Sequence, residues 1–280
     1  MINLKNMIRM TRRTLALAAF MLFLSSPFLS SQKGEFSFIQ ITDPQFGMIS
    51  NNKDLRGETA LFTKAVEKVN QIKPAFVVIT GDLVNDMTNK AQWDEFRRIT
   101  ALINPEIKVY YSPGNHDIGQ DPETEDIDNF RKMFGSDRFS FTYGKCRFIG
   151  INSCIIKSNT PLLEEEQLQW LEKELKKGRK ARETMIFTHY PFFMKDPEEA
   201  ENYSNIKPEI RKRYLDLFSE YGVDAVFSGH LHNNAGGKYS ETEYITTSAV
   251  GRPLGQVKSG MRVITVNKGG FTHQYLPLDN

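Results

Sequence analysis

The sequence predicts an α/β fold, and three observations support this prediction. Apolar runs of strand length alternate from Phe36 onward with stretches whose apolar residues recur at helical spacing, which is the pattern of successive β-α-β units. Several of these runs stop at polar clusters that contain Gly and Asp, as strands do where they reach the ligand-binding loops of an open α/β sheet. No repeat or low-complexity linker divides the chain, so we expect one domain over residues 32–280.

The first half of the chain predicts a regular alternation of strands and helices. A buried strand over residues 36–42 ends at Asp43, and apolar residues at helical spacing predict a helix over 58–71. The continuous apolar strand over 75–80 enters Gly81 and Asp82. Further along we expect a helix at 92–103, a strand at 107–111 and a helix at 127–134.

The second half of the chain contains more β-structure. We expect a hairpin around Gly144, which joins strands at 140–143 and 146–152, and the stretch 238–276 is mostly strand-like. Between them we expect a helix at 164–177, a strand at 184–188, a helix at 208–221 and a strand at 225–228. The polar stretch 195–207 predicts a surface insertion.

The first 31 residues differ in composition from the rest of the chain. Four basic residues lie before or beside an apolar core over 15–24, and Ser and Pro follow it. A spanning helix needs about 20 apolar residues, so this shorter core predicts a signal peptide that is cleaved near Gln32 and an exported, periplasmic or secreted protein. An uncleaved signal that tethers the chain to a membrane is the alternative. Arg12 and Arg13 also resemble a twin-arginine export signal.

Charge and cysteine content exclude several classes of protein. The 36 Lys and Arg against 34 Asp and Glu give a net charge of +2, which is too small for a surface that binds nucleic acid through many phosphates. Without the four basic residues of the first 31, the count becomes 32 against 34 and the net charge −2. Cys146 and Cys154 flank a predicted strand that would hold them about 26 Å apart, so we expect two free thiols.

Five of the predicted strands are followed by residues of metal-binding type. These are Asp43 and Gln45; Asp82, Asn85 and Asp86; Asn115, His116 and Asp117; His189; and His230 and His232. Because the carboxyl ends of strands in an open α/β sheet form one ligand crevice, we expect these segments to converge. Carboxylates, imidazoles and amide oxygens without a thiolate suit divalent metals of hard to borderline character. The sequence therefore predicts a dinuclear metal site.

The order of these segments resembles the calcineurin-like metallophosphoesterase family. The matching blocks are Asp43-x-Gln45, Gly81-Asp82-x-x-Asn85, Gly114-Asn115-His116-Asp117, His189 and Gly229-His230-x-His232. The similarity runs from about Phe36 to the C-terminus, and segments 43–47, 115–119 and 227–237 are similar to the calcineurin-like phosphoesterase domain-containing protein 1 subgroup. The resemblance implies a four-layer α-β-β-α sandwich of two mixed sheets that hydrolyses phosphate esters with two divalent metal ions.

The resemblance also implies a role for each residue at a matching position. The first metal ion would be held by Asp43, Gln45 and His232, and the second by Asn115, His189 and His230. Asp82 would bridge both ions, and His116 would be the general acid that protonates the leaving oxygen. The metals would be Mn, Fe, Mg or Zn.

Two positions depart from the pattern of the family. Gln45 stands where most members have His, and its neutral amide oxygen should favour manganese, iron or magnesium over zinc; alternatively, it is an amide near one metal that does not ligate it. Asn85 stands where many members have the Asp that orients the catalytic His. Asp86 and Asp117 are candidate substitutes for that orienting role.

Three functions are consistent with these residues. The first is a metal-dependent phosphomonoesterase, and the subgroup resemblance implies phosphoserine or phosphothreonine as substrates. The second is a phosphodiesterase that acts on nucleotides or phospholipid headgroups, and the third is a non-catalytic metal-binding protein on a degenerate scaffold. Asn233 and Arg252 lie in loops from which they would reach the substrate.

Overall fold

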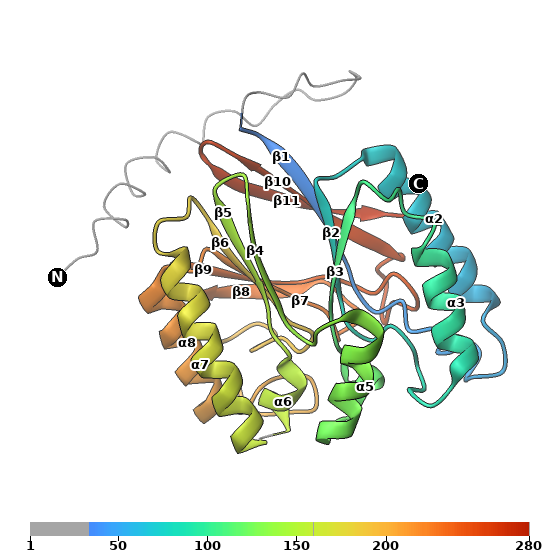
Figure 1. Cartoon of the computed structure of the whole chain (residues 1–280), viewed down its shortest axis with the longest axis horizontal. Helices are drawn as coiled ribbons and strands as arrows, with labels where there is room; N and C mark the ends of the chain where they lie inside the picture. The colour runs from blue at the N-terminus through green and yellow to red at the C-terminus, as the bar shows by residue number, and fades with distance from the viewer. Residues whose placement is uncertain (1–33, 159, 280) are drawn as a thin grey trace.

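The computed structural model describes residues 34–158 and 160–279, which form two mixed β-sheets flanked by helices (Figure 1). One sheet contains β1 (Phe36–Ile41), β2 (Phe76–Thr80), β3 (Lys108–Ser112), β10 (Gly260–Asn267) and β11 (Gly270–Pro277). The other contains β4 (Phe139–Tyr143), β5 (Cys146–Gly150), β6 (Thr184–Phe187), β7 (Ala225–Ser228), β8 (Ala235–Tyr239) and β9 (Thr242–Thr246). The predicted signal peptide lies outside the described residues.

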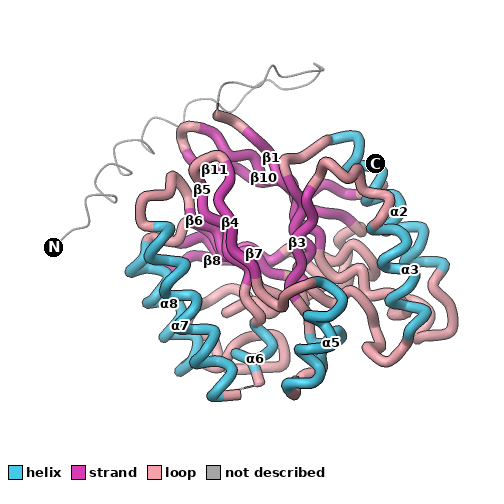
Figure 2. Tube along the Cα trace, viewed as in Figure 1, coloured by secondary structure: helices cyan, strands magenta, loops and turns pink. Residues whose placement is uncertain are grey.

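The order of the strands brings the carboxyl ends of five of them to one region. The first sheet has the order β11-β10-β1-β2-β3, in which β1, β2 and β3 are mutually parallel and β10 is antiparallel to β1. The second has the order β4-β5-β6-β7-β9-β8, with β5, β6, β7 and β9 parallel. Figure 2 shows loops gathered at one end of both sheets, where the sequence places the polar clusters.

Helices cover the outer face of each sheet, which completes the predicted four-layer sandwich. The long helices are α2 (Arg56–Ile72) and α3 (Lys90–Thr100) on one side and α7 (Pro161–Gly178) and α8 (Pro208–Tyr221) on the other (Figure 1). Of the remaining helices, α4 (Asn115–Ile118) follows β3, α5 (Thr124–Phe134) follows α4, and α6 (Ser153–Lys157) follows β5. The fold class expected from the sequence is confirmed.

Strands buried on both faces explain the continuous apolar runs. Alternate side chains of a strand point to opposite faces, so Phe38 and Phe76 enter the core between the sheets, while Ile39 and Val77 pack beneath the helices. The inter-sheet core is rich in aromatic rings. Phe38 stacks on Phe76 at 4.8 Å between centroids and meets Phe148 of the other sheet edge-on at 5.4 Å.

Several expected boundaries were wrong. The strand expected at 146–152 ends at Gly150, and the Asn152 side chain accepts a hydrogen bond from the Cys154 main-chain nitrogen and begins α6. Cys154 is therefore on a helix and not at a strand end, although both cysteines are free and buried as expected. The stretch 238–276 is mostly strand as expected, although residues 247–259 between β9 and β10 form neither helix nor strand.

The expected insertion at 195–207 contains no helix or strand, and most of its residues are at least partly exposed. Among the described residues, no helix is both long and apolar enough to cross a membrane.

Candidate metal centre

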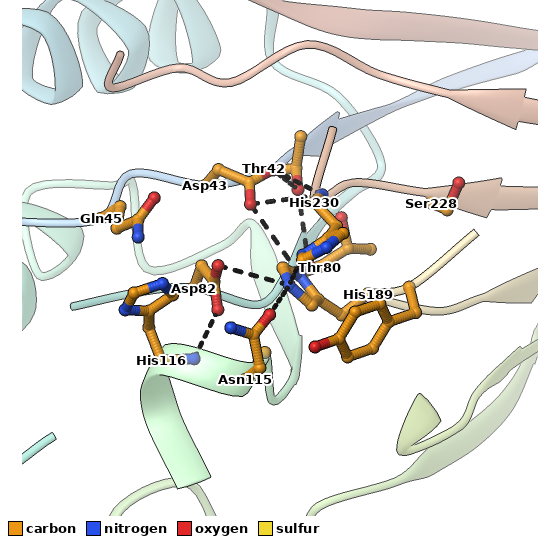
Figure 3. A network of polar contacts seen from close by, with 12 residues as sticks. Thr42, Asp43, Gln45, Thr80, Asp82, Asn115, His116, His189, Ser228 and His230 are labelled. Atoms are coloured by element: carbon orange, nitrogen blue, oxygen red, sulfur yellow. Dashed lines mark hydrogen bonds and ion pairs between the residues drawn. The ribbon is translucent and has the colours of Figure 1, made fainter. Parts of the chain in front are cut away.

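The five polar segments converge on one buried site, as Figure 3 shows for most of their residues. Asp43 and Gln45 follow β1, Asp82 follows β2, and Asn115 and His116 follow β3. His189 follows β6, and His230 and His232 follow β7, so both sheets contribute. The convergence results from the parallel strands, whose carboxyl ends lie together.

The side chains form two groups with the spacing of metal ligands, and Asp82 belongs to both. One group is Asp82, His189 and His230, and the other is Asp43, Asp82 and His232; the donor atoms within each group lie within 4.8 Å of one another. Nε2 of His189 is 3.3 Å from Oδ2 of Asp82, and Nε2 of His232 is 3.5 Å from Oδ1 of Asp43. The shared carboxylate lies where a ligand that bridges two metals would be.

Two further residues, Asn115 and Gln45, offer amide oxygens with the position and chemistry of ligands. Oδ1 of Asn115 is 3.1 Å from Nε2 of His189. Oε1 of Gln45 and Nε2 of His230 are buried without a hydrogen-bond partner, in side chains that are only 1% and 7% exposed. An unpaired buried polar atom costs about 1–3 kcal/mol. These unpaired oxygen and nitrogen atoms, together with the buried carboxylates, fit the ligand set of a divalent cation.

The main chain is strained at the same positions. Five of the residues predicted to bind metal have positive φ angles, which side chains other than glycine rarely adopt. They are Asp43 (52°), Gln45 (37°), Asp82 (48°), His230 (69°) and His232 (50°). Such conformations persist where the surrounding structure enforces them, and they concentrate at functional sites.

Glycines allow the loops of the site to approach closely. A Cβ atom on Gly114 would overlap the main-chain nitrogen and the carboxylate of Asp82, and one on Gly229 would overlap Oγ1 of Thr42. Gly81 has a φ of 82° and lies against Gly114. The Gly-Asp, Gly-Asn-His and Gly-His sequences therefore serve packing as well as chain direction.

The titratable groups of the site hold one another in opposite protonation states. Burial alone would raise the pKa of Asp82, but the charge and hydrogen bond of His189 lower it well below its usual value. Burial alone would lower the pKa of His189, but the carboxylates of Asp82 and Asp43 raise it to about 9. Burial and the neighbouring His189 lower the pKa of His230 to about 3. Protons and metal ions compete for these nitrogens.

The main chain orients His116, the predicted general acid. Its Nδ1 lies 2.8 Å from the main-chain oxygen of Asn85, and its main-chain nitrogen donates to Oδ1 of Asp82 at 2.8 Å. A carbonyl can only accept, so Nδ1 carries a hydrogen and Nε2 is left for proton transfer. Asn85 thus contacts His116 through its main-chain carbonyl. The family resemblance implied a contact through the side chain instead.

The other candidates for orienting His116 have different contacts. The Asp117 carboxylate accepts hydrogen bonds from the main-chain nitrogens of Leu83, Val84 and Gly114 at 2.8–3.2 Å, so it ties two loops together. Burial and the charge of Asp82 raise the pKa of Asp117 to about 8. Asp86 accepts from the main chain and the hydroxyl of Thr88. None of these hydrogen bonds involves the ring of His116.

The predicted substrate-binding residues lie at the rim. Asn233 and Arg252 are exposed, and the main-chain oxygen of Arg252 is 2.5 Å from Nδ1 of His232. Tyr203, in the expected insertion, also reaches the site: its ring lies 5.1 Å from that of His230, and its hydroxyl accepts from Nδ2 of Asn115 at 3.4 Å. Only the path of the 195–207 loop reveals this, because no motif includes Tyr203.

Comparison with known proteins agrees with this geometry. Residues 36–234 match the family model of the calcineurin-like phosphoesterases, and the chain belongs to this family of metal-dependent hydrolases of phosphate esters.

Among curated relatives, the chain is 36% identical over 266 residues to the serine/threonine-protein phosphatase CPPED1 of Bos taurus, covering 88% of this chain and 85% of that protein. Among solved structures, purple acid phosphatase PPD1 from yellow lupin (Lupinus luteus) has a TM-score of 0.68 at 16% identity, covering 88% of this chain and 52% of that one. A dimetal phosphatase from Danio rerio has a TM-score of 0.60 at 16% identity, covering 85% and 98%. These two structures show the shared fold.

Proposed function

We propose that this chain is an exported phosphomonoesterase that binds two divalent metal ions and hydrolyses alkyl phosphates such as phosphoserine and phosphothreonine. The observation that carries the proposal is the pair of ligand groups that share Asp82. The name of the Bos taurus relative, a serine/threonine-protein phosphatase, supports this substrate class.

The family resemblance supplies the proposed ligand sets, and the two groups that share Asp82 support them. Asp43, Gln45 and His232 would hold one ion, and Asn115, His189 and His230 would hold the other, with Asp82 between them. When bound, two divalent ions activate a water molecule and neutralise the charge of the phosphate. The amide oxygen of Gln45 is a harder ligand than the imidazole nitrogen that most family members have there. This ligand favours manganese, iron or magnesium over zinc at the first site.

The residues of the chain supply the proton transfer. With Nδ1 held by the carbonyl of Asn85, the other ring nitrogen of His116 is free to give a proton to the leaving alkoxide. This step matters most for alkyl phosphates, whose leaving groups are poor. His116 is partly buried, and its main-chain bond to Asp82 joins the acid to the shared metal ligand.

We propose export because the first 31 residues have the charge and apolar pattern of a signal peptide. The mature chain would then carry a net charge of −2, so the phosphate would be attracted by the metal ions and not by the body of the protein. Intact-mass measurement of the protein from the exported fraction tests this. A mass without the first 31 residues supports cleavage, and the full-length mass in a membrane fraction indicates an uncleaved tether.

The experiment that tests the function is metal restoration. The protein is stripped of metal, reloaded with Mn²⁺, Fe²⁺, Mg²⁺ or Zn²⁺ separately, and assayed on a phosphomonoester and on the corresponding diester. We expect faster turnover of the monoester, and activity with at least one of the first three ions. Faster turnover of the diester would replace the proposal with a phosphodiesterase, and no turnover with any ion would favour a non-catalytic metal-binding protein.

A further inference from the structure

Four side-chain amides connect the predicted ligand Gln45 to the main chain of a neighbouring loop. Nε2 of Gln45 donates to Oδ1 of Asn85 at 3.2 Å, and Nδ2 of Asn85 donates to Oδ1 of Asn52 at 2.8 Å. Nε2 of Gln92 donates to the same oxygen of Asn52 at 2.8 Å. Oε1 of Gln92 accepts from the main-chain nitrogens of Asn85 and Asp86 at 3.0 and 2.8 Å. We call these four residues the amide relay.

The main chain dictates the direction of every hydrogen bond in the amide relay. A main-chain nitrogen can only donate, so Oε1 of Gln92 must face the two main-chain nitrogens and its Nε2 must face Asn52. Asn52 must then present its oxygen to Gln92 and to Asn85. Asn85 in turn must give its nitrogen to Asn52 and its oxygen to Gln45.

The last amide in the relay is therefore fixed as well. Because Nε2 of Gln45 is engaged with Asn85, its Oε1 is the atom left over, and that oxygen is the buried one without a partner at the metal centre. The opposite orientation would present an amide nitrogen, which cannot ligate a cation. A reversed relay would thus remove one ligand from the first metal without changing Gln45 itself.

The main chain packs closely against the amide relay at Gly47, where no side chain would fit. A Cβ atom on Gly47 would lie 2.5 Å from Nε2 of Gln92 and 2.6 Å from Oδ1 of Asn52. Gln92 is fully buried at the start of α3, whereas Asn52 is exposed and able to turn its amide in water. The two departures from the family pattern, Gln45 and Asn85, are hydrogen-bonded to each other.

We propose that Asn52, Asn85 and Gln92 are positioning residues that hold the amide oxygen of Gln45 toward the first metal ion. This inference rests on the proposed function, in which Gln45 is a ligand. Outer partners of metal ligands typically contribute a factor of about 10–100 to metal affinity. Gln92 would exert this effect although two other amides separate it from Gln45.

Two substitutions of equal charge test the proposal. Asn52→Asp keeps an oxygen acceptor for both of its partners, so the direction of the relay is unchanged. Gln92→Glu keeps the acceptor for the main-chain nitrogens but offers only oxygen to Asn52, whose amide must turn over. Asn85 and Gln45 then turn over in sequence, and the nitrogen of Gln45 faces the metal.

The readout is the affinity of the metal-free protein for Mn²⁺, measured by isothermal titration calorimetry at pH 8. Asn52→Asp should bind both ions within about 3-fold of the unmodified protein, and Gln92→Glu should bind one of them about 10–100-fold more weakly. A simple charge effect has the opposite sign, because both new carboxylates would attract the cation. Unchanged or tighter binding by Gln92→Glu would overturn the proposal.

Two more variants keep the test decisive. If Gln92→Glu does not fold, as judged by circular dichroism, Asn52→Gly removes the shared acceptor at a position whose φ of 64° suits glycine, and it should weaken one ion. Wild-type affinity in Asn52→Gly would then overturn the relay. Gln45→Leu distinguishes a failure of the proposed ligand set from a failure of the amide relay. If this variant retains both ions, the proposed ligand set is wrong. If it alone weakens binding, the ligand set stands and the relay is wrong.

Discussion

Removal of the metal ions should strongly lower the thermal stability of the protein. Five predicted ligand positions have positive φ, and each such conformation costs about 1–2 kcal/mol, so the site stores about 5–10 kcal/mol of strain that bound cations would help to offset. An ion present at 100 times its Kd contributes about 2.7 kcal/mol, and two ions contribute about 5 kcal/mol. At about 2–4 °C per kcal/mol for a domain of this size, Tm should fall by about 10–20 °C.

Differential scanning fluorimetry before and after treatment with a chelator measures this shift, and added Mn²⁺ should reverse it. Asp82→Asn is the matched control, because a variant that binds no metal should show the same Tm with and without chelator. A shift of less than about 2 °C in the unmodified protein would refute the reasoning, and so would an equal shift in the variant.

Three further predictions concern His116, the two cysteines and Gly229. His116→Ala should reduce kcat on alkyl phosphates by about 10²–10⁴ and on aryl phosphates by much less, and equal losses in a steady-state assay would remove His116 from the acid role. Burial raises the pKa of both thiols, so Cys146 and Cys154 should resist iodoacetamide in the folded protein and react fully after denaturation without reductant, as mass spectrometry would record. Gly229→Ala should cost about 1–3 kcal/mol in urea unfolding because its Cβ would overlap Thr42, and an unchanged midpoint would contradict the close packing.

Much of the fold could be predicted from the sequence, and so could the candidate ligand residues that the fold brings together. The strands β2 and β7 are fully buried, so their apolar runs are visible in the sequence, and they are followed by Gly81-Asp82 and Gly229-His230. The early end of β5 had a readable signal in Asn152, which caps the helix that follows. That signal competes with the apolar, strand-like residues Phe148, Ile149 and Ile151 directly before it.

Other features depend on contacts between distant segments and have no signal in the sequence. Nothing in the motif containing Asn85 says whether its carbonyl or its amide faces His116, because the backbone path decides which atom is presented. The place of Tyr203 beside His230 depends in the same way on the route of the 195–207 loop. The positive φ angles of Asp43 and Gln45 likewise follow from how the loops meet.

Metal content of the unmodified protein and of Asp82→Asn tests the central claim most directly, because Asp82 belongs to both ligand groups. After reconstitution and gel filtration, elemental analysis should find two ions per chain in the unmodified protein. In Asp82→Asn it should find both ions and the phosphatase activity lost together. Retention of two ions by the variant would contradict the assignment of Asp82 as the shared ligand of a dinuclear site.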